Sequence, residues 1–342
     1  MLECTTMDQG FWEKLKKPAS PSQGGPFFAL APMADVTDTA FREIIAKYSE
    51  HGTTHGGPDV FWTEFVSCDG LASKGREVLL RDLEYTKGEH PIVAQVFGAH
   101  PENFYKAGLL IRELGFDGAD INMGCPDRSV EKQGAGAALI KNPDLAKELI
   151  AALKEGSGGL PVSVKTRVGY NKDQIDEWIS MLLGEGLAAL TIHARTRKEM
   201  SKVPARWSDV KRVVELRDAM GVKTLIIGNG DVTDMKDGEE KARESGADGV
   251  MLGRAIFGNP WLFNKNIQVS DVPLEEKLRV MVEHTKLFEK KLGDIKNFAI
   301  MKKHYKAYVH GFDGAKELRM ELMETADVAG IERIIARFLA KT

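Results

Sequence analysis

Residues 115–126 read Gly-Phe-Asp-Gly-Ala-Asp-Ile-Asn-Met-Gly-Cys-Pro, the pattern of a strand that ends in a sharp turn. The apolar alternation stops at Asn122, and the Gly-Cys-Pro that follows is typical of a turn. Cys125 is therefore expected at the carboxyl end of a strand, where parallel α/β proteins carry their functional loops. The stretch alone leaves two interpretations open, since a free cysteine here is either a small buried side chain or a reactive thiol.

The same order of an apolar run and a helical segment recurs on both sides of this stretch. Besides the strand that ends at Asn122, strands are expected at residues 27–33, 60–66, 92–97, 162–167, 188–193, 224–228 and 249–253. Helices are expected at residues 37–45, 101–114, 142–155, 173–184 and 233–245. Eight strands that alternate with helices predict an α/β fold of the (β/α)8 TIM-barrel type.

Two other regions flank the predicted barrel, which we expect to span residues 26–264. Residues 1–25 are rich in proline and glycine and are expected to form an irregular lead-in. Beyond the barrel the strand signals end, and helices are expected at residues 274–291, 296–309, 315–325 and 330–340. Residues 265–342 therefore predict a small helical bundle domain.

The composition excludes several classes of protein. The 342 residues are 43% hydrophobic and 28% charged, which is typical of a soluble protein with a packed core. The three cysteines are odd in number and lack a Cys-x-x-Cys spacing, so neither a disulfide framework nor a metal site is expected. The sequence contains no signal-peptide core and no apolar run of about 18 residues, which favours a cytoplasmic protein that is not in a membrane.

Positive charge is concentrated near the carboxyl end. Residues 265–342 carry 15 Lys and Arg against 12 Asp and Glu, net +3, whereas the rest of the chain is net −6. Seven of these lysines lie close together: Lys286, Lys290, Lys291, Lys296, Lys302, Lys303 and Lys306. Such a run is most often a solvated helix face, but it also suits contact with a polyanion such as nucleic acid.

Polar side chains on the predicted strands indicate a ligand site inside the barrel. Because side chains alternate across a strand, Ser163, Lys165 and Arg167 share one face, and this polar face must point inward. The same reasoning places His193 at the barrel mouth. A buried cation is costly unless it is paired, which favours a ligand over the alternative of an internal ion-pair network.

The segments after the last two strands predict an anion site. Residues 228–231 read Gly-Asn-Gly-Asp, and Gly253 and Arg254 follow the eighth strand. Barrels often bind a phosphate at this position, where glycine lets backbone N–H groups approach and arginine adds a charge-assisted pair. The Gly134-Ala-Gly136 segment follows a loop instead of a strand, so it is not a dinucleotide-binding fingerprint.

Taken in order, the motifs of the chain resemble those of the FMN-dependent tRNA-dihydrouridine synthases. The matching blocks run from about residue 27 to residue 263: Ala31-Pro32-Met33-Ala34, Gln95-Val96-Phe97-Gly98, Asn122-Met123-Gly124-Cys125-Pro126, Gly134-Ala135-Gly136, Lys165-Thr166-Arg167, His193-Ala194-Arg195-Thr196-Arg197, Gly228-Asn229-Gly230-Asp231 and Gly253-Arg254. Lys302-Lys303-His304-Tyr305 resembles part of the family's helical tail.

This resemblance implies an enzyme that uses FMN and NADPH to reduce the C5–C6 bond of a uridine in tRNA. It implies that Cys125 is the general acid and that Asn122, Arg167, Arg195 and Arg197 bind the substrate. The cofactor contacts that it implies are Pro32, Met33, Ala34, Gln95, Lys165 and His193, with Asn229, Gly230, Asp231, Gly253 and Arg254 around the phosphate. These roles suit the residue types, because a thiol is protonated at neutral pH and an arginine can neutralise an oxyanion.

Under this interpretation the uridine must leave the folded RNA to reach the barrel, and residues 265–342 bind the surrounding tRNA. Two alternatives stay open. One is an FMN barrel oxidoreductase that acts on a small pyrimidine, similar to dihydroorotate or dihydropyrimidine dehydrogenases, which would give the lysine-rich tail no role. The other is a tRNA-binding protein with vestigial catalytic parts, which the presence of Cys125, Lys165 and His193 disfavours. A monomer is expected, and the sequence does not specify which uridine is reduced.

Overall fold

The computed structural model of the protein describes residues 10–15, 25–54 and 56–341, which form two compact units. Of the described residues, the first unit comprises those within Met1–Pro32, Asp59–Leu83 and His90–Gly253, and the second comprises those within Met33–Pro58, Glu84–Glu89 and Arg254–Thr342. Most of the predicted lead-in lies outside the described residues. Its described part includes a short helix, α1 (Trp12–Leu15). The buried indole of Trp12 packs against Phe27 and Trp62 and so holds this helix to the barrel.

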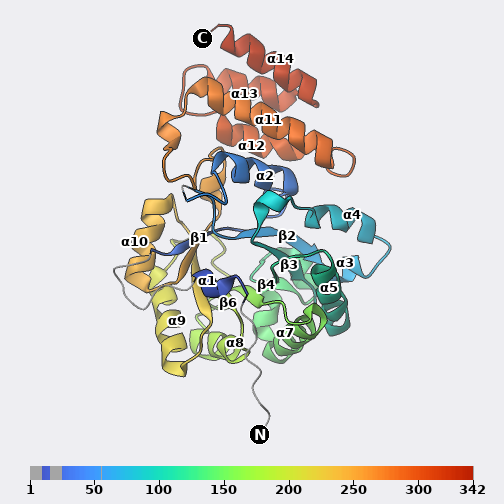
Figure 1. Ribbon diagram of the computed structural model, residues 1–342, viewed down its shortest axis with the longest axis vertical. Coiled ribbons are helices and arrows are strands. Elements are labelled where there is room, and N and C mark those ends of the chain that lie inside the picture. The colour runs from blue at the N-terminus through green and yellow to red at the C-terminus, as the bar shows by residue number, and fades with distance from the viewer. Residues whose placement is uncertain (1–9, 16–24, 55, 342) are drawn as a thin grey trace. The chain divides into compact units, whose positions relative to one another are not determined.

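The first unit is built around a parallel sheet of eight strands (Figure 1). In chain order they are β1 (Phe27–Leu30), β2 (Phe61–Ser67), β3 (Ile92–Phe97), β4 (Gly118–Met123), β5 (Val162–Arg167), β6 (Ala189–His193), β7 (Leu225–Asn229) and β8 (Gly249–Leu252). Their order in the sheet is β1-β8-β7-β6-β5-β4-β3-β2. The N–H of Leu30 donates to the carbonyl of Val60 at 3.3 Å and so joins β1 to the β2 side of the sheet. The predicted (β/α)8 barrel is confirmed.

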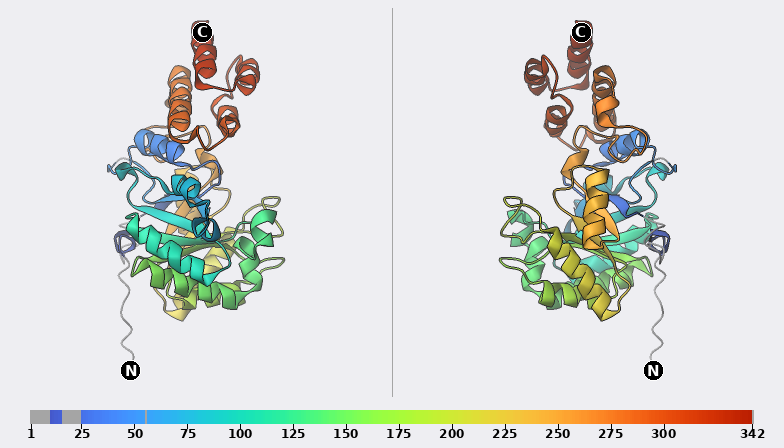
Figure 2. Two further views of the ribbon diagram at one scale, coloured as in Figure 1. Left: turned by 90° about the vertical axis from the view of Figure 1, so that its right-hand side faces the viewer. Right: turned by 90° about the vertical axis from the view of Figure 1, so that its left-hand side faces the viewer.

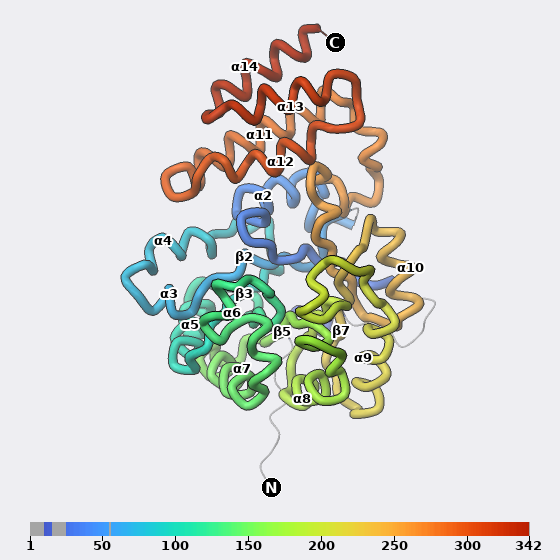
Figure 3. Tube along the Cα trace, turned by 180° about the vertical axis from the view of Figure 1, so that it is seen from behind, coloured from blue at the N-terminus to red at the C-terminus, as the bar shows by residue number. Residues whose placement is uncertain are grey.

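Helices cover the outer face of the barrel, as Figures 1 and 3 show. They are α5 (Pro101–Glu113), α7 (Pro143–Ser157), α8 (Ser180–Gly184), α9 (Trp207–Met220) and α10 (Met235–Ser245). The shorter helices α3 (Cys68–Leu71), α4 (Arg76–Leu80) and α6 (Arg128–Lys132) follow strands β2 and β4, and the 3-10 helix η3 (Gly136–Lys141) leads into α7. The sequence analysis did not predict α9, whose buried apolar side chains are few: Val210, Val213 and Val214.

The helix predicted at residues 173–184 has two parts in the structure. It begins as a π-helix, η4 (Ile175–Ile179), and continues as α8. The indole of Trp178 in η4 donates to the hydroxyl of Thr166 at 3.0 Å. Thr166 therefore faces the outer helices, while its neighbours Lys165 and Arg167 face the interior, which is the alternation that the sequence predicts.

The second unit is helical, and its four carboxyl-terminal helices are coloured orange to red in Figures 1 and 2. Its helices are α2 (Thr39–Tyr48), α11 (Leu274–Leu292), α12 (Met301–Tyr308), α13 (Ala315–Glu324) and α14 (Val328–Leu339). The segment predicted as one helix at residues 296–309 contains a 3-10 turn, η7 (Phe298–Ile300), before α12. The other three predicted helices correspond to α11, α13 and α14.

Three segments of the range predicted for the barrel, residues 33–58, 84–89 and 254–264, belong to this second unit. The ring of Phe41 in α2 stacks on His284 of α11 and meets His304 of α12 edge-on, each at a centroid distance of 4.7 Å. Arg42 forms a fully buried ion pair of 2.6 Å with Glu89. Aromatic packing and this ion pair therefore bring three separate parts of the chain into one core.

Among the residues that the structure describes, no helix is long and apolar enough to cross a membrane. Within the same residues, no three His, Cys, Asp or Glu side chains gather in a way that could hold a metal ion.

Candidate active site

Cys125 lies in a turn that the side chain of Asn122 organises. The Asn122 Oδ1 atom accepts hydrogen bonds from the backbone N–H groups of Gly124, at 3.1 Å, and Cys125, at 2.9 Å. Gly124 favours the close approach of the two strands here, because a Cβ atom would lie 3.2 Å from the backbone of Thr166 on the next strand. The turn leaves Cys125 half-buried at the end of β4.

The Gly134-Ala-Gly136 segment supports this turn from the other side. Gly136 has φ +60°, and a Cβ atom there would lie 2.8 Å from the carbonyl oxygen of Cys125. The same carbonyl accepts the N–H of Ala137 at 2.9 Å. The glycine motif therefore holds the cysteine loop by close backbone contact.

Arg167, at the end of β5, attaches its guanidinium to the same loop. Its Nε donates to the carbonyl of Gly124 at 2.8 Å, and its Nη1 donates to the carbonyls of Thr196 and Met200 at 3.2 and 3.0 Å. Burial, with the neighbouring charge of Arg195 as second cause, lowers the pKa of Arg167 to about 10. The group stays charged at neutral pH, and a positive charge is fixed beside the thiol.

The thiol itself is held in its protonated form. Burial raises the pKa of Cys125, while Arg167 and Lys165 act in the opposite direction through their charges. Because burial is the largest of these causes, the thiol keeps its proton at neutral pH.

Lys165 projects into the barrel, where its neighbours include the amide of Asn229 and the side chains of Asp120 and Arg167. Its Nζ donates to Oδ1 of Asn229 at 3.1 Å, and the Asn229 Nδ2 donates to the carbonyl of Met251 at 2.8 Å, which fixes the amide orientation. Burial, followed by the charge of Arg167, lowers the pKa of Lys165 to about 8. Thr191, its register partner on β6, has a buried hydroxyl that bonds no described residue. An ammonium and a free hydroxyl thus face the interior side by side.

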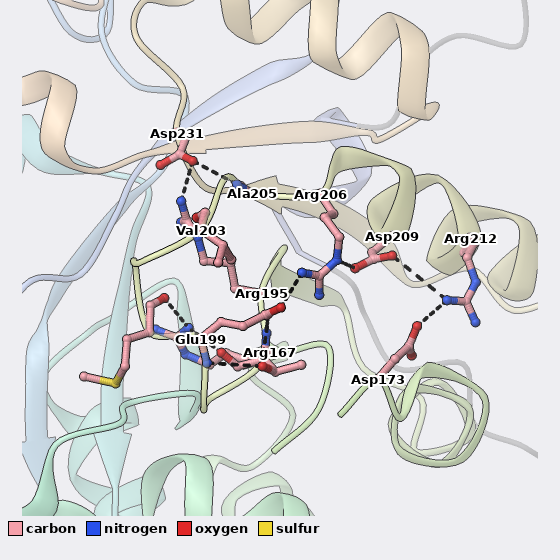
Figure 4. A network of polar contacts seen from close by, with 12 residues as sticks. Arg167, Asp173, Arg195, Glu199, Val203, Ala205, Arg206, Asp209, Arg212 and Asp231 are labelled. Atoms are coloured by element: carbon pink, nitrogen blue, oxygen red, sulfur yellow. Dashed lines mark hydrogen bonds and ion pairs between the residues drawn. The ribbon is translucent and has the colours of Figure 1, made fainter. Parts of the chain in front are cut away.

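His193 has a defined tautomer. Nη1 of Arg195 lies 3.1 Å from its Nε2 atom, and because a guanidinium only donates, this nitrogen carries a lone pair. Arg195 also donates from Nε to the carbonyl of Val203 at 2.6 Å and forms an ion pair with Asp231 (Figure 4). The structure therefore places Arg195 among the predicted cofactor residues, between His193 and Asp231.

The turn after β7 has the close approach that the glycines predict. Gly230 has φ +126°, and a Cβ atom there would lie 2.8 Å from the side chain of Ala205. The indole of Trp207 donates to the carbonyl of Gly230 at 2.9 Å, and the carboxylate of Asp231 accepts the N–H of Ala205 at 2.9 Å. The first contact comes from the start of α9, and the second comes from the segment between β6 and α9.

That segment is held by a network of charges (Figure 4). Glu199 accepts the N–H of Thr196 at 2.7 Å and pairs with Arg206 at 2.6 Å, and Arg206 also pairs with Asp209 at 2.9 Å. The hydrogen bond from Arg206 is the largest cause that lowers the pKa of Glu199 to about 2. The loop that presents the Thr196 and Met200 carbonyls to Arg167 is therefore rigidly built.

Arg197 lies at a different place from Arg195. It forms an ion pair with Glu131 of α6, and its guanidinium carbon lies 5.3 Å from the centre of the Tyr170 ring. Nζ of Lys141 lies 4.4 Å from the same ring. Sequence reasoning missed Glu131, Tyr170 and Lys141, although Glu131 follows Cys125 by only six positions.

The remaining predicted site residues fall at the ends of the barrel strands. The N–H of Ala31 donates to the carbonyl of Leu252 at 2.8 Å, so the segments ending in Pro32 and Gly253 run together at the β1–β8 edge. Met33, Ala34 and Arg254 directly follow these two residues in the chain and belong to the second unit. Their roles toward a cofactor stay predictions.

A (β/α)8 barrel with a thiol, an arginine, a lysine and a histidine at the ends of its strands has the architecture of a barrel enzyme. Comparison with known proteins narrows this class. The family model described as dihydrouridine synthase (Dus) matches residues 29–339. The chain belongs to the dihydrouridine synthase family, and it is therefore an enzyme, a flavin-dependent oxidoreductase.

Two relatives are similar over nearly their whole length. The "probable tRNA-dihydrouridine synthase" of Staphylococcus aureus (strain Mu50 / ATCC 700699) is 40% identical over 338 residues, covering 98% of this chain and 97% of the relative. The "probable tRNA-dihydrouridine synthase 2" of Bacillus subtilis (strain 168) is 40% identical and covers 98% of both chains.

Among solved structures, histamine dehydrogenase from Rhizobium sp. 4-9 matches with a TM-score of 0.51 and 12% identity, covering 82% of this chain and 51% of that chain. The 6-hydroxypseudooxynicotine amine oxidase of Pseudomonas geniculata N1 matches with a TM-score of 0.50 and 15% identity, covering 73% and 48%. At this identity the likeness concerns the fold alone.

Proposed function

We propose that the protein is a tRNA-dihydrouridine synthase, which uses FMN and NADPH to reduce the C5–C6 bond of a uridine in tRNA. The observation that carries the proposal is the place of a protonated, half-buried Cys125 on the turn whose Gly124 carbonyl accepts a hydrogen bond from the guanidinium of Arg167. Such a pair combines a proton donor with a fixed positive charge. Relatives that bear the name of this activity match the chain nearly end to end.

The residues inside the barrel suit a flavin. Lys165 is a half-buried cation whose hydrogen-bond partner is a neutral amide, and the buried hydroxyl of Thr191 bonds no described residue. These groups and the donor of His193 would hold the polar edge of FMN, together with Gln95 and with the Pro32, Met33 and Ala34 turn. When bound, FMN supplies the hydride that reaches the pyrimidine.

The phosphate of the cofactor would be held by Asn229, Gly230, Gly253 and Arg254. Gly230 allows close backbone approach, since its φ of +126° and the nearness of Ala205 exclude a side chain. Asp231 would repel a phosphate as a bare carboxylate, but its ion pair with Arg195 neutralises it. Its proposed role is therefore to fix the turn and Arg195.

Cys125 and Arg167 would carry the proton and charge steps. Reduction at C6 leaves negative charge on the pyrimidine, which needs a proton at C5. Cys125 can donate this proton because burial keeps its thiol protonated at neutral pH. Arg167 is held by three backbone carbonyls and would stabilise the developing oxyanion without moving.

The residues proposed for substrate contact differ in how many of their polar atoms already bind other protein groups. Asn122 gives its carbonyl oxygen to the cysteine turn and one amide hydrogen to Gln95, which leaves a second hydrogen for the base. Arg197 is tied to Glu131 and the Tyr170 ring. Arg195 would act at the boundary between cofactor and substrate, next to His193.

Ion pairs divide the seven lysines that we propose for tRNA contact into two groups. Three of the seven pair with carboxylates: Lys286 with Glu332 at 2.5 Å, Lys291 with Glu43 at 2.7 Å and Lys296 with Asp35 at 3.8 Å. Lys290, Lys302, Lys303 and Lys306 form no ion pair within the described chain. Three of these lie on the short helix α12, which is the proposed phosphate-binding surface.

The test is to purify the protein, record its visible spectrum and supply NADPH with unmodified tRNA. Flavin absorbance together with tRNA-dependent dihydrouridine would support the proposal. Flavin absorbance without product on a complete set of tRNAs would instead favour a reductase for a small pyrimidine. A colourless protein that binds tRNA would favour the vestigial alternative.

A further inference from the structure

Four side chains form one continuous line of hydrogen bonds inside the barrel, from Ser163 to the cysteine turn. Gln95, Asp120 and Ser163 are register partners on β3, β4 and β5, so they lie at one level of the interior. Ser163 Oγ donates to Oδ1 of Asp120 at 2.5 Å, and Gln95 Nε2 donates to Oδ2 of Asp120 at 2.6 Å. The Asn122 Nδ2 then donates to Oε1 of Gln95 at 3.0 Å. We call these four residues the relay.

The direction of the hydrogen bonds in the relay can be followed outward from the cysteine turn. The backbone N–H groups of Gly124 and Cys125 can only donate, so Asn122 must present its oxygen to them and its NH2 group to Gln95. Gln95 must therefore present its oxygen to Asn122 and its NH2 group to the next residue. The residue at position 120 must accept that bond, and an ionised carboxylate does so with either oxygen.

We propose that Asp120 is a positioning residue, which fixes the turn that carries Cys125 through Gln95 and Asn122. Its carboxylate is completely buried, and Gln95 is completely buried as well, so no solvent can replace either partner. Without an acceptor at position 120, the amide of Gln95 loses the bond that holds its orientation, and Asn122 loses the matching one. The importance of the relay for catalysis rests on the proposed function; the positioning of the thiol does not.

A charge relocation tests this polarity. In Gln95→Leu, the side chain at position 95 can neither donate to Asp120 nor accept from Asn122, so the relay is cut at its centre. In the double variant Gln95→Glu with Asp120→Asn, the new amide at position 120 donates to the new carboxylate. The Ser163 hydroxyl then donates to the amide oxygen, and Asn122 still finds an acceptor at position 95. The double variant has the net charge of the wild type and every relay bond.

The readout is the rate at which iodoacetamide alkylates Cys125 in the flavin-loaded protein, without NADPH or tRNA. Peptide mass mapping separates Cys125 from Cys4 and Cys68, and rates are compared at equal flavin absorbance. We expect Gln95→Leu to raise the rate about tenfold, the factor that one buried hydrogen bond carries. The double variant, which restores every relay bond, should keep the rate within about twofold of the wild type.

An unchanged alkylation rate in Gln95→Leu, or a double variant that alkylates as fast as Gln95→Leu, would overturn the proposal. A second pair of variants covers the case in which Gln95→Leu does not fold. Asp120→Asn keeps an acceptor for Gln95, because Ser163 can accept from the new amide, and should leave the rate near that of the wild type. Asp120→Leu removes the acceptor and should raise the rate about tenfold; equal rates in this pair would also overturn the proposal.

The assay separates this proposal from the proposed function. Alkylation requires neither reductant nor RNA, so the relay can fail while Cys125 still acts as the acid. Conversely, Cys125→Ala tests the acid role by turnover and does not depend on the relay. Turnover of the relay variants adds a third measurement: a positioning role predicts a lowered kcat with little change in KM for tRNA.

Discussion

Nε of Arg167 donates to the carbonyl oxygen of Gly124 at 2.8 Å, which attaches the guanidinium to the residue just before Cys125. This hydrogen bond therefore holds the proposed proton donor and the positive charge in a fixed position relative to each other. Arg167→Lys keeps the charge but loses the planar fork that binds three carbonyls. We expect kcat to fall about 100-fold, as when an oxyanion donor is removed. Arg212→Lys, a half-exposed arginine of the charge network in Figure 4, is the matched control and should leave kcat unchanged. A wild-type kcat in Arg167→Lys would contradict this role.

Cys125→Ala should give a folded, yellow protein that has lost most of its turnover, because the pyrimidine then lacks its proton donor. Cys68→Ala is the control, since that thiol is buried beside β2 and should be dispensable for kcat. Steady-state dihydrouridine formation measures both variants. Retention of wild-type turnover in Cys125→Ala would remove the acid role.

The pH dependence of kcat in the wild type provides a separate test of the thiol. An acid must be protonated, and burial raises the pKa of Cys125 above its ordinary value of 9.0. Turnover should therefore hold across neutral and mildly alkaline pH and fall only above about pH 9. A decline already below pH 8 would show that another group supplies the proton.

Changing Lys302, Lys303 and Lys306 together to Glu should weaken tRNA binding, because these lysines on α12 form no ion pair within the described part of the chain. Each phosphate contact contributes about 0.9 to the slope of log affinity against log salt, so the slope should decrease by about 2 to 3. Filter binding across a salt series measures it. Reduction of the flavin by NADPH should not change.

The control for this variant reverses a paired lysine: Lys286→Glu with Glu332→Lys keeps the ion pair and the local charge. It should bind tRNA as the wild type does. If the triple variant also binds normally, the RNA surface lies elsewhere than α12.

The stability of the second unit should fall as the pH is lowered. Burial lowers the pKa of His304 to about 3 and that of His284 well below its ordinary value of 6.5. The unfolded chain protonates these rings below pH 6.5 while the folded unit does not, so their stabilising contribution is complete above pH 6.5 and is lost as the pH falls toward 3. At pH 5 the loss from His304 should be about 2 kcal/mol, and His284 should act in the same direction.

His304→Phe checks this prediction, since a phenyl ring can keep the contacts with Phe41 and Phe257 but cannot take up a proton. Urea titrations at two pH values, followed by amide exchange of α11 and α12 peptides, should show a smaller pH dependence in the variant. An equal dependence in both proteins would assign the effect to other groups.

The strands and their inward faces could be predicted from the sequence because both depend on local alternation. Lys165 and Arg167 point inward for the same reason that Thr166 reaches Trp178 on the outside. Helix α9 could not be predicted, because its charged residues are solvated and only a few valines face the barrel. The thiol, the arginine and the lysine of the site were predicted, and the tests above address their roles.

The neighbours that fix those groups could not be predicted. Asp120 reaches Gln95, and Glu131 reaches Arg197, only after the barrel has brought distant strands and loops together. The place of Phe41 in the second unit depends on two histidines more than two hundred positions away. Periodicity reports the face on which a side chain lies, but it does not report which side chain it will meet.

The core of the second unit is shared among three separate chain segments. This determines when the unit can complete its folding during synthesis. Helix α2 leaves the ribosome long before α11 and α12, so Phe41 and Arg42 are made well ahead of His284 and His304. The apolar face of α2 stays without these partners until α11 and α12 have been translated. A gene fusion or truncation placed near residue 264 would leave that face permanently without its partners, and the helices beyond would lose Phe41 from their core.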